Sequence, residues 1–216
     1  MDMNLLKKTI PLLCILLVAC SSSRIKAAEK NVDNSEISEE LRPIGNFKEI
    51  TMSTVADIYF YQEKGSPTLT IKGEKEMVDL IKTSTENGVL KIYTTEKDFN
   101  NNGKKRVKIE LSAPSVEKIS VTGVGDVYME NPVSLDNLHL RLSGVGNMYI
   151  KKLSCNELSV SLSGVGNIDL AGKCKYANLK MQGVGHIDCR RLTGQTTSKA
   201  TGVGSIKTAN GEIKNP

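Results

Sequence analysis

A five-residue phrase, Gly-Val-Gly-polar-apolar, recurs in the C-terminal half of the chain and constrains the fold more than any other feature. Its five copies begin at Gly123, Gly144, Gly164, Gly183 and Gly202, so successive copies are 21, 20, 19 and 19 residues apart. A nearly constant period of this length is the signature of a solenoid, in which each repeat forms one coil that stacks on its neighbours.

The residues around the phrase predict strands. Apolar side chains stand two and four residues before the first glycine and four and six residues after it, as in Ile119 and Val121 before Gly123 and Val127 and Met129 after it. This alternation has the two-residue period of a half-buried strand, and the frequent glycines exclude a helix. We therefore expect an all-β, single-stranded parallel β-helix with about 20 residues per coil and rungs about 4.8 Å apart.

The phrase itself predicts a corner of the coil. Glycine at two fixed places allows the backbone to turn with positive φ and allows coils to stack with no Cβ between them. The valine between the glycines is expected to be the only core-pointing side chain at that corner. The last coil carries Thr196, Ser198 and Thr208 where earlier coils carry apolar residues. A polar last coil is typical of an end cap, which has no neighbour to cover it.

Residues 44–114 are expected to form a less regular β portion that leads into the regular coils of 115–216. Thr54-Val55-Ala56-Asp57-Ile58 repeats the phrase with threonine and alanine in place of the glycines, which predicts a degenerate first coil. A short amphipathic patch covers 74–81. Asn87-Gly88 predicts a hairpin turn before a strand over 89–93, and a further strand is expected over 107–111.

The first 19 residues have the pattern of a signal peptide. Lys7 and Lys8 precede an apolar stretch over 10–18, which is too short to span a bilayer as a helix. The stretch ends in Leu17-Val18-Ala19-Cys20, which resembles the bacterial lipobox. That resemblance implies a lipid on Cys20, cleavage before it, and an envelope protein anchored to the outer membrane of a Gram-negative bacterium, on its periplasmic or outer face. The alternative is an ordinary signal peptide with an incidental cysteine.

Residues 20–43 are expected to form a flexible linker, because their polar composition buries too little apolar surface to order them. The net charge of the whole chain is +5, and aromatic and basic residues do not alternate as in single-strand binders, so we expect no nucleic-acid partner. No CxxC motif or Cys/His cluster indicates zinc, and neither a metal site nor a cofactor is expected.

Two cysteines fall in one column of adjacent coils. Cys155 and Cys174 each stand nine residues before a first glycine. A rung spacing of about 4.8 Å lies within the Cα separations that a disulfide tolerates. A disulfide between them and a pair of stacked core thiols are the two alternatives.

The candidate binding residues share one outward stripe. Five places after each first glycine stand Tyr128, Tyr149, Asp169, Asp188 and Lys207, and three places after it stand Asp126, Asn147, Asn167, His186 and Ser205. One interpretation is a glycan-binding face, in which the tyrosines give a flat apolar platform and the amides and carboxylates bind hydroxyl groups. The other interpretation is a solvated ladder.

Asp169 and Asp188 lie on neighbouring coils, where their charges would repel each other. A bound cation or a raised pKa would relieve the repulsion. The pair also suggests the closely spaced carboxylates of a retaining glycosidase, which require a separation of about 5–5.5 Å. This enzymatic interpretation is the weaker one, because the chain has only two histidines, His139 and His186, and β-helix enzymes present several acids and bases in a cleft.

Beside the lipobox, three sequence features support a family assignment: the segment Phe47-Lys48-Glu49-Ile50 with Val55-Ala56-Asp57-Ile58, the segment 87–92, and the serial Gly-Val-Gly phrases. Together they resemble the GIN-domain family, described as putative auto-transporter adhesin head domains, from about Ile44 to the end of the chain. The resemblance implies a right-handed β-helix and a role in adhesion or envelope structure. The family offers no catalytic motif.

Three functions follow from these observations. The first is a non-catalytic envelope lipoprotein that binds a glycan or an envelope protein along the stripe or a sheet face. The second is a structural scaffold in which several copies dock side by side as a homo-oligomer. The third is a polysaccharide hydrolase or lyase built on a β-helix.

Overall fold

The structure is a computed structural model that describes residues 36–95 and 106–214. These residues belong to one compact unit that begins at Ser35. The predicted signal peptide, the predicted lipidation site Cys20 and the first part of the predicted linker therefore lie outside the described residues. Within the described part, no helix is long and apolar enough to cross a membrane.

The described residues form strands and one short helix, in the following order. The elements are β1 (Ile37–Arg42), β2 (Glu49–Ser53), β3 (Ala56–Gln62), β4 (Thr68–Glu74), α1 (Lys75–Leu80), β5 (Ile81–Glu86), β6 (Val89–Thr94), β7 (Val107–Ala113), β8 (Lys118–Val121), β9 (Val127–Met129), β10 (Val133–Leu142), β11 (Val145–Leu162), β12 (Val165–Met181), β13 (Val184–Ala200), β14 (Val203–Thr208) and β15 (Gly211–Lys214).

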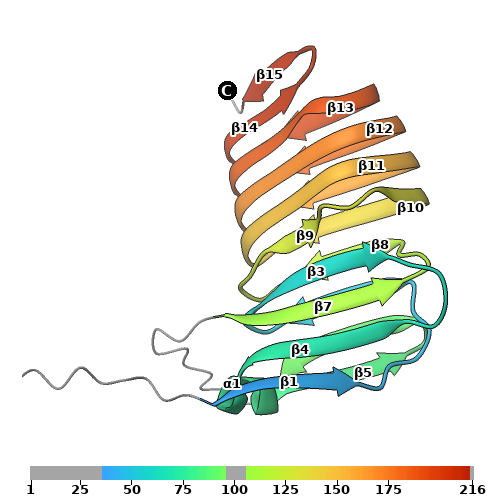
Figure 1. The fold of residues 1–216 in the computed structure, drawn as a ribbon. Helices are drawn as coiled ribbons and strands as arrows, with labels where there is room; N and C mark the ends of the chain where they lie inside the picture. Colours follow the sequence, from blue (N-terminus) through green and yellow to red (C-terminus); the bar gives the residue numbers. More distant parts are fainter. Residues whose placement is uncertain (1–35, 96–105, 215–216) are drawn as a thin grey trace, which may run out of the picture. The chain divides into compact units, whose positions relative to one another are not determined.

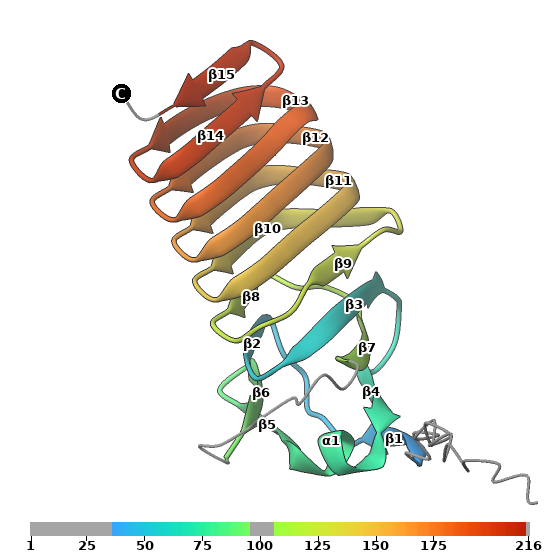
Figure 2. The same ribbon diagram turned by 90° about the vertical axis from the view of Figure 1, so that its left-hand side faces the viewer.

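The strands make one continuous sheet that winds into a two-sided solenoid (Figure 1). The first side contains β1, β4, β7, β3 and β9, continues with the first halves of β11, β12 and β13, and ends with β14 and β15. The second side contains β5, β6, β2, β8 and β10 and continues with the second halves of β11, β12 and β13. The long strands run without interruption from one side to the other (Figure 2).

Adjacent regular coils pair in parallel, and equivalent places of the repeat lie opposite one another. Val145 lies opposite Val165, Tyr149 opposite Asp169, and Cys155 opposite Cys174. The pairing of equivalent places continues into the next coil, with register shifts only in the segment between Asp169 and Tyr176. The predicted parallel β-helix with about 20 residues per coil is therefore confirmed.

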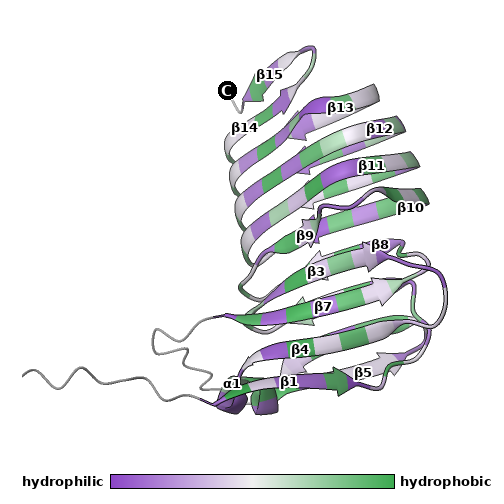
Figure 3. Cartoon of the chain, viewed as in Figure 1, coloured by the Kyte–Doolittle hydropathy of each residue, from purple (hydrophilic) through white to green (hydrophobic). Residues whose placement is uncertain are grey.

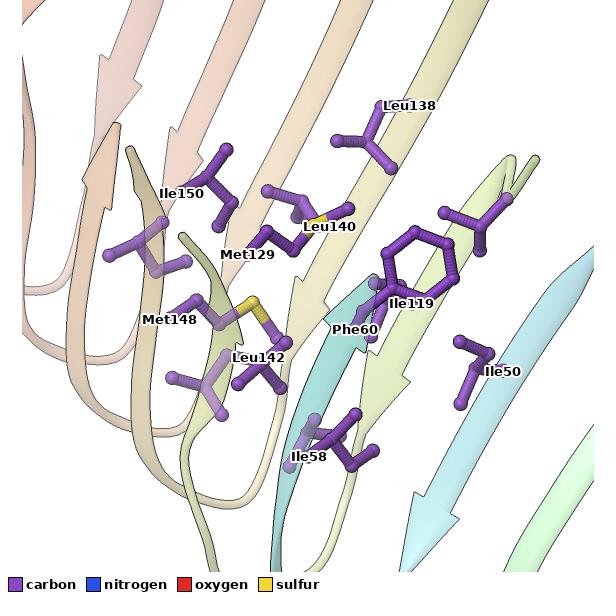
Figure 4. Packing of buried hydrophobic residues seen from close by; sticks show 14 of the residues in the cluster. Ile50, Ile58, Phe60, Ile119, Met129, Leu138, Leu140, Leu142, Met148 and Ile150 are labelled. Carbon is purple, nitrogen blue, oxygen red and sulfur yellow. The ribbon is translucent and has the colours of Figure 1, made fainter. Parts of the chain in front are cut away.

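The interior is filled by the apolar residues of the alternating pattern, which appears as bands along the strands in Figure 3. Ile58 and Phe60 of β3 and Met148 of β11 point into one shared interior (Figure 4). Burying such a side chain contributes about 1.5–3 kcal/mol. The entry portion and the regular coils are therefore stabilised by a common core.

The glycines of the phrase permit close stacking of the corners. A Cβ on Gly164 would lie 1.9 Å from the carbonyl oxygen of Gly144, and a Cβ on Gly166 would lie 1.6 Å from that of Gly146. Gly166 also has a φ of 149°, in a region that L-residues rarely adopt. The predicted close stacking is confirmed for both glycines, whereas the predicted positive φ is found only at the second glycine of the phrase.

The prediction that the valine of the phrase points into the core is wrong. Val145 and Val165 are each 49% exposed and Val203 is 71% exposed. The two-residue alternation continues through the corner, so that the glycines take the crowded positions and the valine between them points outward. The valines form an apolar column along one exposed edge of the solenoid.

The entry portion combines a degenerate coil with antiparallel strands. β2 pairs in parallel with β8, and Val55 bridges Val124, which confirms the coil predicted at Thr54 to Ile58. Asn87 and Gly88 both have positive φ, 51° and 75°, and join β5 and β6 as a hairpin, as predicted. However, β4 runs antiparallel to β7, which the repeat did not predict.

The predicted linker over 20–43 extends too far, because its last residues form β1. This strand pairs antiparallel with β4. Its apolar side chains, Ile37 and Leu41, are exposed, whereas Arg42 donates hydrogen bonds to the carbonyl oxygens of Val78 and Ile81. Backbone pairing with β4 and this polar contact hold the strand in place. The linker prediction was wrong here because it assumed that a segment becomes ordered only by burying apolar side chains.

At the other end, the last coil is capped. Its predicted polar places, Thr196 and Ser198, are partly exposed. Strand β15 then folds back antiparallel on β14 and covers the last coil of the first side. The polar coil agrees with the sequence prediction, while the hairpin was not predicted.

Candidate functional site

The polar column three places after each first glycine is a ladder of hydrogen bonds between coils. The backbone N–H of Asn147 donates to Oδ1 of Asp126 (2.7 Å), that of Asn167 to Oδ1 of Asn147 (3.1 Å), and that of His186 to Oδ1 of Asn167 (3.2 Å). Asp57 extends the ladder into the entry portion, because its Oδ1 accepts a hydrogen bond from the backbone N–H of Asp126 (2.8 Å). These side chains join one coil to the next, which matches the solvated-ladder interpretation of the column.

The tyrosines five places after the glycine belong to a stack of three rings. Tyr59 and Tyr128 have ring centroids 4.5 Å apart, and Tyr128 and Tyr149 have centroids 5.2 Å apart, with interplanar angles of 14° and 18°. The Nζ atom of Lys108 lies 4.5 Å from the centroid of Tyr59. Stacked rings cover each other's faces, so both faces of the Tyr128 ring are occupied by Tyr59 and Tyr149. The predicted flat platform is therefore not what the stack presents to solvent.

Tyr59 was missed by the sequence reasoning although a signal existed. It stands five places after Thr54, the residue that replaces the first glycine in the degenerate coil, so the column could have been extended to it. Asp57 stands three places after Thr54 and was missed for the same reason. Both residues continue their columns into the entry portion.

Charges at the lower end of the stripe are paired internally. Arg106 contacts Asp57 (3.0 Å) and Asp126 (3.3 Å). Burial raises the pKa of Asp57, while the hydrogen bond from the Asp126 backbone and the charge of Arg106 oppose that rise. Burial, assisted by the carboxylate of Asp126, raises the pKa of Tyr128 to about 12. The Tyr128 hydroxyl thus stays protonated and donates to Asp126 (3.3 Å).

The two aspartates at the upper end of the stripe are each paired with an arginine. Arg191 donates to Asp169 (2.9 Å), and Arg190 binds Asp188 (2.6 Å). The hydrogen bond from Arg190 holds the pKa of Asp188 below its usual value, so the expected rise is wrong for that residue. Within 36–95 and 106–214, no three His, Cys, Asp or Glu side chains are grouped so that they could hold a metal ion.

The cysteine pair lies where the spacing predicts. Cys155 and Cys174 are buried thiols, and Cys155 donates to Cys174 with a sulfur–sulfur distance of 3.1 Å. Burial raises the pKa of Cys155 above its ordinary value. Burial likewise raises the pKa of Cys189, the third buried thiol, to about 11. Oxidation of the pair to a disulfide stays a prediction.

The second side carries a groove that the sequence reasoning missed. A hollow of about 360 Å³ lies over the second halves of β10 to β13. Its polar and aromatic lining comprises His139, Glu157, Ser159, Tyr176, Asn178, Gln195 and Thr197. A neighbouring hollow of about 430 Å³ shares His139 and Ser159 with it and reaches Arg141, Lys118 and Glu49. We call the two hollows together the second-side groove.

The groove offers polar groups that the protein itself does not engage. Among the described residues, the side chains of His139, Glu157, Tyr176, Asn178 and Gln195 have no hydrogen bond or ion pair. Tyr176 is 47% exposed, and its ring contacts the Nζ atom of Lys175 at 5.1 Å from the centroid. An exposed ring beside unengaged hydrogen-bonding groups is a suitable surface for a ligand with both apolar and hydroxyl-bearing parts.

A signal for Tyr176 was present in the repeat. It stands seven places before Gly183, in a column whose other members are Asn137, Glu157 and Gln195. A single aromatic residue in an otherwise polar, outward column does not serve the core. Stacking in register places Tyr176 between Glu157 below and Gln195 above.

Comparison with known proteins agrees with this architecture. A family described as "Putative auto-transporter adhesin, head GIN domain" matches residues 46–214. A putative adhesin from Bacteroides fragilis has 32% sequence identity and a TM-score of 0.76, with 80% of each chain covered. A putative lipid binding protein from Parabacteroides distasonis has 22% identity and a TM-score of 0.65, covering 81% of this chain and 82% of that one, and shows the fold alone. No curated protein matches the chain.

Proposed function

Because the chain belongs to the family of putative auto-transporter adhesin head GIN domains, we propose that it is a non-catalytic, adhesin-like binding protein of the cell envelope. Its ligand is a carbohydrate, bound in the second-side groove. The protein is held to the membrane by a lipid on Cys20. The adhesin description of the Bacteroides fragilis protein supports the general role.

One observation supports the choice of the groove: the side chains of His139, Glu157, Asn178 and Gln195 around Tyr176 are unengaged among the described residues, whereas the polar groups of the stripe bind one another. Asn178 and Gln195 have both donors and acceptors free among the described residues, and the exposed ring of Tyr176 lies in the same hollow. Sugars present hydroxyl groups at their edges and apolar C–H groups on their faces. Amide side chains and an exposed ring are complementary to those two kinds of surface.

A binding experiment tests this proposal. The full chain in detergent is applied to a printed array of bacterial and host polysaccharides, beside Tyr176→Ala and a double variant of Tyr128→Ala and Tyr149→Ala. We expect Tyr176→Ala to lose binding while its thermal unfolding stays unchanged. Loss of binding only in the double variant, with that variant still folded, would assign the ligand to the stripe and contradict the proposal. Release of reducing sugars from a bound polysaccharide would contradict the non-catalytic role.

The anchoring part is tested separately. We expect the wild-type chain expressed in a Gram-negative host to fractionate with the outer membrane and to incorporate labelled palmitate. The Cys20→Ser variant should lose the label and leave the membrane fraction. A Cys20→Ser variant that stays with the membrane would show that another element anchors the chain.

A further inference from the structure

A column of cations runs beside the groove. Three places before the first glycine of successive coils stand Arg141, Ser161, Lys180 and Lys199. They lie in register on the outer face of the second side. Among the described residues, Arg141, Lys180 and Lys199 form no ion pair, and no acidic residue interrupts the column. The column is an unneutralised positive strip.

The rest of the groove does not cancel this charge. Lys118 and Glu49 form an ion pair with each other at 2.8 Å. The column one residue before that of Tyr176 carries both a cation, Lys175, and an anion, Asp136. Glu157 is the one carboxylate among the residues that line the hollow around Tyr176. The groove with its flanking strip is therefore positive, which favours an anionic ligand.

The length of the groove indicates a polymer. The two hollows share His139 and Ser159 and extend from Gln195 on β13 to Glu49 on β2. This path crosses five strand-to-strand steps along the second side. At about 4.8 Å per step, the groove is about 24 Å long. A single sugar would occupy only part of it.

We infer that the ligand of the second-side groove is an acidic polysaccharide, whose sugar rings contact Tyr176 and whose carboxylates bind Arg141, Lys180 and Lys199. The inference rests on the proposed carbohydrate-binding function and adds the charge and the length of the ligand. Asn178 and Thr197 lie between the ring and the cation column and bind sugar hydroxyls. Lys180 and Lys199 each follow Asn178 and Thr197 by two residues along their strands. They can therefore bind the carboxylates of a sugar ring that lies in the groove.

The test compares polygalacturonate, an acidic polymer, with dextran, an uncharged one, on the full chain in detergent. We expect polygalacturonate to bind at least about tenfold more tightly than dextran. A triple variant with Arg141→Gln, Lys180→Gln and Lys199→Gln should bind polygalacturonate about tenfold more weakly. Tyr176→Ala should also weaken it about tenfold at every salt concentration, because ring contact is not screened by salt.

The matched control removes the same charge elsewhere. The control is a triple variant with Lys64→Gln, Lys152→Gln and Lys214→Gln, three lysines that do not line the groove. It should leave polygalacturonate binding within about twofold of wild type. An equal loss in this control, or equally tight binding of single-stranded DNA, would show general electrostatic attraction and overturn the inference. Equal binding of dextran, still lost in Tyr176→Ala, would overturn the acidic ligand but retain the proposed function. Binding that is insensitive to Tyr176→Ala would overturn both. Binding of neither polymer would overturn the inference, and if no polysaccharide of the array binds either, it would overturn the proposed function as well.

Discussion

The two sides of the solenoid have the same repeat and the same core but use their outward columns differently. On the first side, Asp126, Asn147 and Asn167 bind the backbone of the next coil, and Tyr59, Tyr128 and Tyr149 stack on one another. On the second side, the polar groups around Tyr176 are unengaged among the described residues. On the first side the outward groups thus stabilise the fold, while the unlike residues around Tyr176 leave their groups for a ligand.

The two sides of each coil meet at the glycine corner, where successive coils stack closely. Gly166→Ala should lower the free energy of unfolding by more than about 4 kcal/mol, because the new Cβ would lie 1.6 Å from the carbonyl oxygen of Gly146. Gly211→Ala is the matched control, since Gly211 has a similar φ of 140° but no atom within 4 Å of its ideal Cβ. Urea unfolding followed by circular dichroism measures both. Equal losses would show that backbone conformation, rather than coil stacking, explains the glycine.

Removing one tyrosine from each side sharpens the contrast. Tyr128→Ala should lower the free energy of unfolding by about 3 kcal/mol, because its ring packs between Tyr59 and Tyr149. Tyr176→Ala should change it by less than about 0.5 kcal/mol, since the ring is 47% exposed. Chemical denaturation of both variants gives the difference. A larger loss for Tyr176→Ala would mean that the groove is part of the framework.

The same contrast applies to the amides. Asn147→Ala should cost about 1–2 kcal/mol, because it removes the acceptor of the Asn167 backbone N–H and the donor to Asp126. Asn178→Ala should be neutral within about 0.5 kcal/mol, as its side chain has no partner in the described part of the chain. Thermal unfolding of the pair provides the measurement. A neutral Asn147→Ala would contradict the ladder as a stabilising element.

A pH dependence gives the smallest effect. The pKa of Tyr128 rises to about 12 in the folded protein, mainly through burial. Its neutral form therefore adds stability that is complete below the ordinary tyrosine pKa of about 10 and is lost as pH rises through about 12. Urea midpoints measured from pH 8 to 12 should fall less steeply in Tyr128→Phe than in the wild type, and Tyr176→Phe serves as the control. An unchanged slope in Tyr128→Phe would remove Tyr128 from the explanation.

The regular coils could be predicted because, in stacked coils, residues at the same place of the sequence repeat lie next to each other in space. Tyr149 and Asp169 are opposite each other for the same reason that Cys155 and Cys174 are. The direction of the valine was wrong, although carrying the alternation of Val121 and Val127 through the corner would have placed Val124 outside. In the entry portion, antiparallel pairing and strand β1 depend on contacts such as that of Arg42 with α1, which no repeat encodes.

The candidate site was less accessible to sequence reasoning. Column membership was predicted correctly, but whether a column faces a ligand depends on side-chain geometry. Asp169 and Asp188 were expected to act on each other, yet two arginines of β13, Arg190 and Arg191, pair with them. The groove was missed because Tyr176 differs from its column, and a search for repetition passes over differences.

The most direct test is a crystal structure of the protein with an oligomer of galacturonic acid. We predict density for the sugar over Tyr176, with its carboxylates near Lys180 and Lys199. Density along Tyr128 and Tyr149, with an empty groove on the second side, would contradict the assignment of the two sides.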